Sequence, residues 1–328
     1  MQRRSVLLAV NFALGVAGLV WVCWHFGANA LDLLARSWSP PLLAAFVATV
    51  LAAIVVSALR WRIVLHGVDL APSLARLCAF RAASQTVSSV MPGGRIGGEP
   101  LRAWYAIRTG VPAWAAITTV AVDRTLEMAS NLGFVVFFAL VLLARDVPGI
   151  ERTVAGALVG ALSLGIAIAL GVRRLRTGGL FAPFVRRLGL TRPGLADYTA
   201  VVERAEDGVR RLLGRPAILG IALGVGIVAD LLTLVQYKCL LAAFDLPSTP
   251  VAVVAAIFAS GAARTLPVPG AVGAVEAAEI GLFGMLGHPP EVGLAVGLAT
   301  RLRDVAWAAP GIAFMLVQSP FGTKLEQV

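Results

Sequence analysis

The sequence has few charged residues and few reactive side chains for its length. Charged residues make up 14% of the 328 positions, lysine occurs only at Lys238 and Lys324, and the three cysteines and three histidines stand far apart. These spacings match no zinc-site pattern and form no disulfide framework. There is no ATP-binding motif, and no Ser-His or Cys-His arrangement is present. We therefore expect no metal, no cofactor and no enzymatic activity.

Long apolar runs dominate what is present. At 58% hydrophobic residues, the chain is predicted to be an all-α, polytopic membrane protein. No soluble module carries a basic face, so the net charge of +10 does not point to nucleic acid; it fits the arginine bias of cytoplasmic loops. The predicted spans are Ser5–Phe26, Leu42–Leu65, Ala113–Leu143, Thr153–Val172, Pro216–Ala243 and Pro290–Val317.

One stretch of the chain occurs twice, 177 residues apart and without a gap. The shared positions are turn formers and membrane charges: Pro92, Gly93, Glu99, Gly110, Pro112, Arg124 and Glu127 correspond to Pro269, Gly270, Glu276, Gly287, Pro289, Arg301 and Asp304. Internal repeats with interrupted helices are typical of transporters. We predict one domain over residues 1–328, with repeats at about 42–143 and 216–317.

Two regions of the repeats do not fit simple spans. Ser73–Val90 and Gly98–Thr109 flank one Pro-Gly break, and Pro250–Leu266 and Val272–Leu286 flank the other. Each pair carries charges that cannot face lipid, so we predict two re-entrant helical hairpins covered by protein or water. The predicted hinge residues are Pro92, Gly93, Gly94, Pro269 and Gly270.

Arginine counts predict the orientation. The loop 173–215 contains ten arginines against four acids, and Arg60 and Arg62 end the second span, so both places are predicted to be cytoplasmic, as are the two termini. An interfacial helix is predicted at Asp197–Leu213. Hairpin one then enters from the cytoplasm and hairpin two from outside, which makes the repeats inverted. Treating 73–90 as a full span would place the basic loop outside and is disfavoured.

Charged residues cluster at corresponding depths of the third and sixth spans. Spacing of three or four residues places Arg124 and Asp123 beside Glu127, and Arg301 beside Asp304. Because one charge at bilayer depth costs about 2.5–3.5 kcal/mol, such groups must pair inside the bundle. We predict a substrate site facing a central cavity, with Arg124 and Arg301 on opposite walls. Its candidate residues are Arg95, Glu99, Asp123, Arg124, Glu127, Arg264, Glu276, Arg301, Arg303 and Asp304.

Structural roles remain alternatives for these residues. Each arginine could simply join two helices, with Asp230 as a partner for Arg301 or Arg303. Glu99 and Glu276 are expected to lock their hairpins rather than to carry protons, although Glu99, Asp123 and Glu127 are the obvious proton candidates. The glycines around Arg95 either let backbone and guanidinium approach a phosphate or merely form a tight tip.

These motifs resemble the flippase-like family, the transmembrane region of lysylphosphatidylglycerol synthases. The resemblance rests on Pro92–Arg102, on Asp123, Arg124 and Glu127, on the hairpin from Leu266 to Glu276, and on Arg301 with Asp304. It covers essentially the whole chain and implies movement of an aminoacylated phospholipid between leaflets. The chain lacks the aminoacyltransferase domain, so synthase activity is not implied. The second hairpin has fewer glycines than relatives have, which leaves the substrate open.

Three functions follow as hypotheses. The first is a flippase or scramblase of the cytoplasmic membrane for an anionic or phosphate-bearing lipid, such as a phospholipid, an aminoacyl-phospholipid or a polyprenyl phosphate. The second is a secondary carrier of a soluble anion. The third is a membrane partner of a glycosyltransferase or cell-envelope enzyme; a homo-oligomer is also compatible with the sequence.

Overall fold

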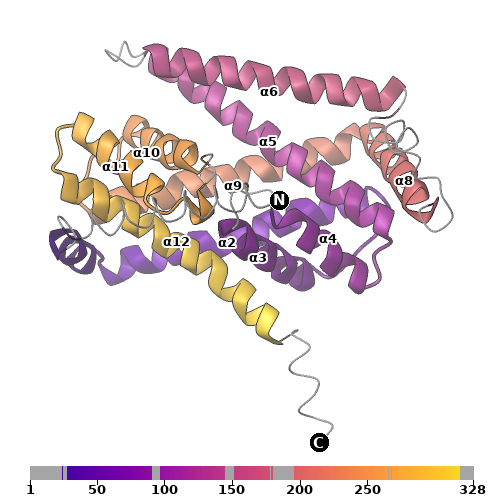
Figure 1. The fold of residues 1–328 in the computed structure, drawn as a ribbon, viewed down its shortest axis with the longest axis horizontal. Coiled ribbons are helices and arrows are strands. Elements are labelled where there is room, and N and C mark those ends of the chain that lie inside the picture. The colour runs from indigo at the N-terminus through magenta and orange to yellow at the C-terminus, as the bar shows by residue number, and fades with distance from the viewer. Residues whose placement is uncertain are drawn as a thin grey trace, which may run out of the picture. The chain divides into compact units, whose positions relative to one another are not determined.

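The computed structural model describes residues 24, 28–90, 97–144, 151–177, 179, 196–264, 266 and 268–317. Every regular element in these ranges is a helix, which confirms the all-α prediction (Figure 1). The helices are α2 (Pro40–His66), α3 (Leu74–Val90), α4 (Glu99–Arg108), α5 (Ala113–Leu143), α6 (Glu151–Thr177), α8 (Ala196–Leu213), α9 (Pro216–Ala243), α10 (Pro250–Ala263), η1 (Pro269–Ala271), α11 (Ala274–Met285) and α12 (Pro290–Val317).

Four of the described helices are long and apolar enough to cross a bilayer: Pro40–His66, Ala113–Val141, Leu158–Thr177 and Pro216–Ala243. They coincide with four predicted spans. The predicted sixth span is the 28-residue helix α12, which carries Arg301, Arg303 and Asp304 in its middle. The first predicted span, Ser5–Phe26, falls almost wholly outside the described ranges, and Trp24 within it is helical.

The helix ends repeat as the sequence does. Asp69 follows α2 with φ 62° and Asp245 follows α9 with φ 51°, both left-handed. In each case the next residue donates its N–H back into the helix, from Leu70 to the Leu65 carbonyl and from Leu246 to the Leu241 carbonyl. This is the usual left-handed end of a helix. The two helix ends thus share one hydrogen-bond pattern, at a spacing of 176 residues, one less than that of the sequence repeat.

The same correspondence holds where the hairpins end. Gly110 and Gly287 both have positive φ, 96° and 83°, and a helix begins shortly after each of them. Val111 donates to the Ala106 carbonyl and His288 to the Phe283 carbonyl. Glycine is needed here because an L side chain is strained at such a φ. The same succession of a long, two short and a long helix thus occurs twice in the described structure. The inverted orientation of the two repeats remains a prediction.

The chain forms two compact units that do not coincide with the repeats. Unit 1 comprises Met1–Ile54, Ala79–Leu101 and Leu231–Val328, and unit 2 comprises Val55–Cys78 and Arg102–Asp230. Unit 1 therefore holds most of α3 together with all of α10, η1, α11 and α12. Unit 2 holds the end of α2 and the helices α5, α6 and α8.

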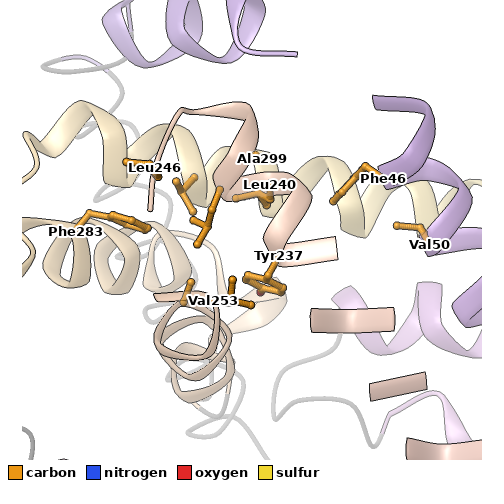
Figure 2. Packing of buried hydrophobic residues seen from close by; sticks show 11 residues of the cluster. Phe46, Val50, Tyr237, Leu240, Leu246, Val253, Phe283 and Ala299 are labelled. Atoms are coloured by element: carbon orange, nitrogen blue, oxygen red, sulfur yellow. The ribbon is translucent and has the colours of Figure 1, made fainter. Parts of the chain in front are cut away.

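The core of unit 1 is apolar and draws on five helices. Figure 2 shows its buried side chains, which come from α2, α9, α10, α11, α12 and the residue Leu246 that follows α9. Phe46 and Val50 belong to α2, and Tyr237 and Leu240 to α9. Because α10 and α11 are too short to span the bilayer, this packing holds hairpin two against long helices.

The turn Pro269–Ala271 between α10 and α11, which we call the second elbow, lies against α3 within unit 1. The corresponding break of hairpin one is called the first elbow. A Cβ on Gly270 would lie 3.4 Å from the Ser89 carbonyl oxygen of α3. Farther along α3, Thr86 Oγ1 donates to the Ala308 carbonyl of α12 at 3.1 Å. A Cβ at Gly311 would overlap Thr86 Oγ1, so glycine permits this close helix contact.

Unit 2 packs α5 against α6 and α8, and these contacts can be followed in Figure 1. Thr118 of α5 donates to the Ala205 carbonyl of α8 at 2.8 Å, and a Cβ at Gly208 would lie 2.8 Å from Thr118 Oγ1. The helix predicted at Asp197–Leu213 is present as α8, and part of its surface is buried against protein. The basic loop begins later than predicted, because α6 continues helically through Arg173, Arg174 and Arg176 to Thr177.

Candidate functional site

Unit 2 contains a buried chain of ion pairs centred on α5. Asp123 accepts from Arg60 Nε and from Arg102 Nη1, both at 2.7 Å. Glu127 accepts from Arg60 Nη2 and from Arg124 Nη1, both at 2.8 Å. The two acids are four residues apart on one helix, so a single guanidinium from α2 reaches both. We call these five residues the α5 cluster.

Burial makes the pairing of the α5 cluster obligatory. Arg60, Arg102 and Asp123 are essentially inaccessible, and the Arg102 guanidinium lies 4.7 Å from the centre of the Trp61 ring. Removing one partner of such a pair leaves an uncompensated charge, which costs several kcal/mol. Arg124 differs from Arg60 and Arg102, since its side chain is 18% exposed. Its Nε also has no hydrogen-bond partner in the described structure, so Arg124 is the accessible member of the cluster.

In unit 1, Arg301 locks the second elbow. Its Nε and Nη2 donate to the Glu276 carboxylate at 2.7 and 3.1 Å, while Nη1 and Nη2 donate to the carbonyls of Gly270 and Ala271 at 2.6 and 2.7 Å. Four of the five guanidinium N–H groups are used. Both carbonyls belong to left-handed residues, with φ of 63° and 49°. Glu276 therefore pairs with an arginine, and Arg301 serves mainly to hold the backbone of the hairpin.

Next to this lock, one carboxylate is shared by three arginines. Asp304 Oδ2 lies 2.9 Å from Arg264 Nη2 and 3.8 Å from Arg301 Nη1, and Asp304 Oδ1 lies 3.6 Å from Arg303 Nη2. The Arg303 guanidinium also lies 5.2 Å from the centre of the Tyr237 ring. The Nε atoms of Arg264 and Arg303 are buried and have no acceptor within the described residues. Arg264, Glu276, Arg301, Arg303 and Asp304 form what we call the α12 cluster.

The α12 cluster carries an excess of positive charge. Within the described part of unit 1, its ion pairs join three guanidinium groups to two carboxylates. An unbalanced charge at membrane depth is costly, so a mobile anion is a natural complement. The donors best placed for it in unit 1 are on Arg264 and Arg303.

Most predicted site residues belong to these two clusters. Asp123, Arg124 and Glu127 fall in one, and Arg264, Glu276, Arg301, Arg303 and Asp304 in the other. Glu99 begins α4, whereas Arg95 and the hinge Pro92, Gly93 and Gly94 lie outside the described residues. Pro269 and Gly270 form the turn η1 between α10 and α11. The predicted cavity between Arg124 and Arg301 remains a prediction.

Three arginines have partners that their position in the sequence did not indicate. Arg60, near the end of its predicted span, is buried between Asp123 and Glu127. Arg301 and Arg303, for which Asp230 was offered as a partner, pair with Glu276 and Asp304 in the described structure. The partners of Arg60 and the Glu276 partner of Arg301 lie far away in the sequence. Sequence spacing alone cannot identify such a partner.

Four polar residues of these sites were not among the predicted site residues. Arg60 and Arg102 belong to the α5 cluster, and Ser260 donates a 2.6 Å hydrogen bond to Glu279 beside the α12 cluster. One signal was available for Arg102 and Glu279, because they occupy matching positions 177 residues apart. No group of three or more potential metal ligands occurs among the described residues.

Comparison with known proteins agrees with this architecture. Residues 6–311 match the sequence family described as the lysylphosphatidylglycerol synthase TM region. The chain belongs to this family. The resemblance inferred from the hairpin and arginine motifs is thereby confirmed, and family and helices together make the chain a multi-pass membrane protein.

A relative of similar length occurs in an archaeon. The UPF0104 membrane protein of Methanothermobacter thermautotrophicus is 25% identical over 346 residues, which cover 99% of this chain and 95% of the relative. No solved structure matches the chain. The relative's name states that it is a membrane protein.

Proposed function

We propose that this protein moves an anionic, phosphate-bearing lipid between the leaflets of the cytoplasmic membrane and is a transporter rather than an enzyme. One observation carries the proposal: three guanidinium groups lie within 4 Å of the single carboxylate of Asp304. A phosphate passing through hydrocarbon must exchange water for other donors. Guanidinium groups supply planar pairs of donors that match phosphate oxygens.

Arg264 and Arg303 are assigned to the lipid headgroup, and Arg301 to the hairpin. Arg264 and Arg303 each have a buried Nε without an acceptor in the described structure. Arg301 instead donates four N–H groups to Glu276 and to the carbonyls of the elbow. In unit 2 the partly exposed Arg124 has the corresponding role. The remaining predicted residues, Glu99, Asp123, Glu127, Glu276 and Asp304, hold these arginines or their hairpins in place, and Arg95 is proposed as a headgroup contact at the first elbow.

The family supports a lipid as the anion. Its name refers to the membrane region of enzymes that make lysylphosphatidylglycerol, a phospholipid whose headgroup carries a phosphate. An aminoacyl-phospholipid is therefore one member of the proposed substrate class, beside simpler phospholipids and polyprenyl phosphates. A soluble anion remains the competing substrate, since the same donors would bind it.

Reconstitution into vesicles tests the proposal. Purified protein in phosphatidylcholine vesicles is expected to accelerate the exchange of fluorescent phosphatidylglycerol between leaflets, measured by chemical quenching of the outer leaflet. Arg264→Gln and Arg303→Gln should slow the exchange. Arg36→Gln is the control and should not slow it, because Arg36 forms an exposed ion pair with Asp32. Lipid exchange equal to that of empty vesicles across several lipid classes would overturn the proposal. Uptake of radiolabelled phosphate or sulfate instead would identify a soluble-anion carrier.

The proposed inverted topology has its own test. If hairpin one enters from the cytoplasm and hairpin two from outside, the turns at Gly110 and Gly287 lie on opposite sides of the membrane. Single cysteines at the exposed positions Thr109 and Met285, in a variant without native cysteines, should then react with an impermeant reagent from opposite sides. Labelling of both from one side would refute the inverted repeat.

A further inference from the structure

Glu279 is a buried carboxyl group without an ion pair in the described structure. It lies on α11 with 0% of its surface exposed. Oε1 accepts a 2.6 Å hydrogen bond from Ser260 Oγ of α10, and Oε2 is buried without a hydrogen-bond partner among the described residues. Glu276 and Asp304, the other two acids of this region, both pair with arginine.

The charged groups around Glu279 come from each helix that packs against it. Arg264 stands one turn after Ser260 at the end of α10, Arg303 comes from α12, and Glu276 precedes Glu279 by one turn on α11. The backbone of α12 approaches closely, since a Cβ at Gly293 would lie 2.8 Å from the Glu279 carbonyl oxygen. Both of these arginines, Arg264 and Arg303, have a buried Nε that lacks an acceptor among the described residues.

These neighbours give Glu279 two stable environments. As a neutral acid it fits the described arrangement, because a buried carboxylate without a cation is strongly disfavoured. As a carboxylate it would attract the guanidinium of Arg264 or Arg303. The proton therefore decides whether these donors are available to another anion. The net charge of the α12 cluster together with Glu279 changes from positive to zero when the proton leaves.

We propose that Glu279 is a proton-binding site that couples proton movement to movement of the phosphate headgroup; this rests on the proposed function. When a proton is bound, Arg264 and Arg303 bind the phosphate of the lipid. When the proton is lost, the Glu279 carboxylate competes for the same donors and the phosphate is released. Proton and lipid anion thus bind together and cross in the same direction, so one proton balances the charge of one singly charged headgroup.

Glu279→Gln, which keeps the shape and the hydrogen bond to Ser260, mimics the protonated form. In vesicles with equal pH on both sides, exchange of fluorescent phosphatidylglycerol by the wild type should fall as pH rises from 5.5 to 8, by up to about tenfold per pH unit for a single titrating group. The Gln variant should keep the rate of the wild type at low pH throughout. Glu291→Gln, on the first turn of α12 and without ion pair or hydrogen bond among the described residues, is the matched control and should retain the wild-type pH dependence.

A second measurement separates this inference from the proposed function. With a phosphatidylglycerol gradient imposed across the vesicles, a trapped pH dye should report proton movement with the wild type and none with Glu279→Gln. Wild-type lipid exchange that is independent of pH, or proton movement that survives the substitution, would overturn the coupling while leaving the lipid transport intact. Absence of lipid exchange in the wild type at every pH would overturn the proposed function. If Glu279→Gln fails to fold, native mass spectrometry of the wild type tests the coupling instead. The protein should retain phosphatidylglycerol at pH 5.5 and retain less of it at pH 8. Equal retention at both pH values would overturn the coupling.

Discussion

Substituting Arg301 by alanine should destabilise the second elbow more than any other single arginine substitution in unit 1. The side chain is 24% exposed, yet it holds the carboxylate of Glu276, which is 1% exposed, and two carbonyls of the left-handed turn. After the substitution these three acceptors lose a charged donor. The elbow then keeps its unfavourable backbone angles without the contacts that offset them.

The size of the effect follows from the buried ion pair. Breaking such a pair by removing one partner costs about 3–5 kcal/mol, because the other charge stays buried. Lost hydrogen bonds to Gly270 and Ala271 act on the same turn, so they are not added separately. For a chain of this length a loss of 1 kcal/mol lowers Tm by roughly 2 °C, so Arg301→Ala should lower Tm by roughly 6–10 °C.

Thermal unfolding of the purified protein in detergent measures this prediction. Arg36→Ala is the control, since the side chains of Arg36 and Asp32 are 79% and 53% exposed and such pairs contribute little to stability. The double variant Arg301→Ala with Glu276→Gln should be more stable than Arg301→Ala alone, because no carboxylate is left without a partner. An unchanged Tm in Arg301→Ala, or a double variant less stable than the single one, would refute the assignment of Arg301 to the elbow.

Three further predictions concern other contacts. Arg60→Leu should lower the unfolding free energy by about 3–5 kcal/mol, because Asp123 and Glu127 stay buried; Tm against wild type checks this, and a loss no larger than that of Arg36→Ala would contradict it. Gly311→Ala should cost about 1–3 kcal/mol through overlap with Thr86 Oγ1, whereas Gly284→Ala, which meets open space, should be neutral in the same unfolding assay. Arg303→Gln should slow lipid exchange, and it should lower Tm less than Arg301→Ala does. A larger fall of Tm in Arg303→Gln than in Arg301→Ala would contradict the roles assigned to the two arginines.

The repeat and the helix types could be predicted because they depend on local sequence. Apolar runs identify the spans, and Gly110, Gly287, Pro112 and Pro289 mark where a hairpin ends and a long helix begins. Matching turn formers at one spacing require matching backbone angles. The structure bears this out at the hydrogen-bond level, in the turns after Ala106 and Phe283.

The pairing of the charges could not be predicted, because it depends on contacts between helices. Sequence spacing predicted the pairing of Arg124 with Glu127, because both lie on one helix. It could not show that Arg60 reaches the same glutamate from α2. Arg60 also resembled an interfacial arginine, since it stands near the end of an apolar run. Only the packing of α2 on α5 reveals that this arginine is buried.

The two repeats use equivalent arginines in different local settings, and this difference bears on mechanism. Arg124 and Arg301 correspond in sequence, but Arg301 binds Glu276 and the elbow, while Arg124 binds Glu127 on its own helix. Arg102 and Glu279 correspond as well, and there the charge is reversed. The first repeat therefore places a buried arginine where the second places a buried acid. A permanent cation can hold Asp123 throughout the proposed transport, whereas an acid can gain and lose a proton. Any proton dependence of transport should accordingly arise in the second repeat, and Arg102→Gln should lower stability without removing the pH dependence of the wild type.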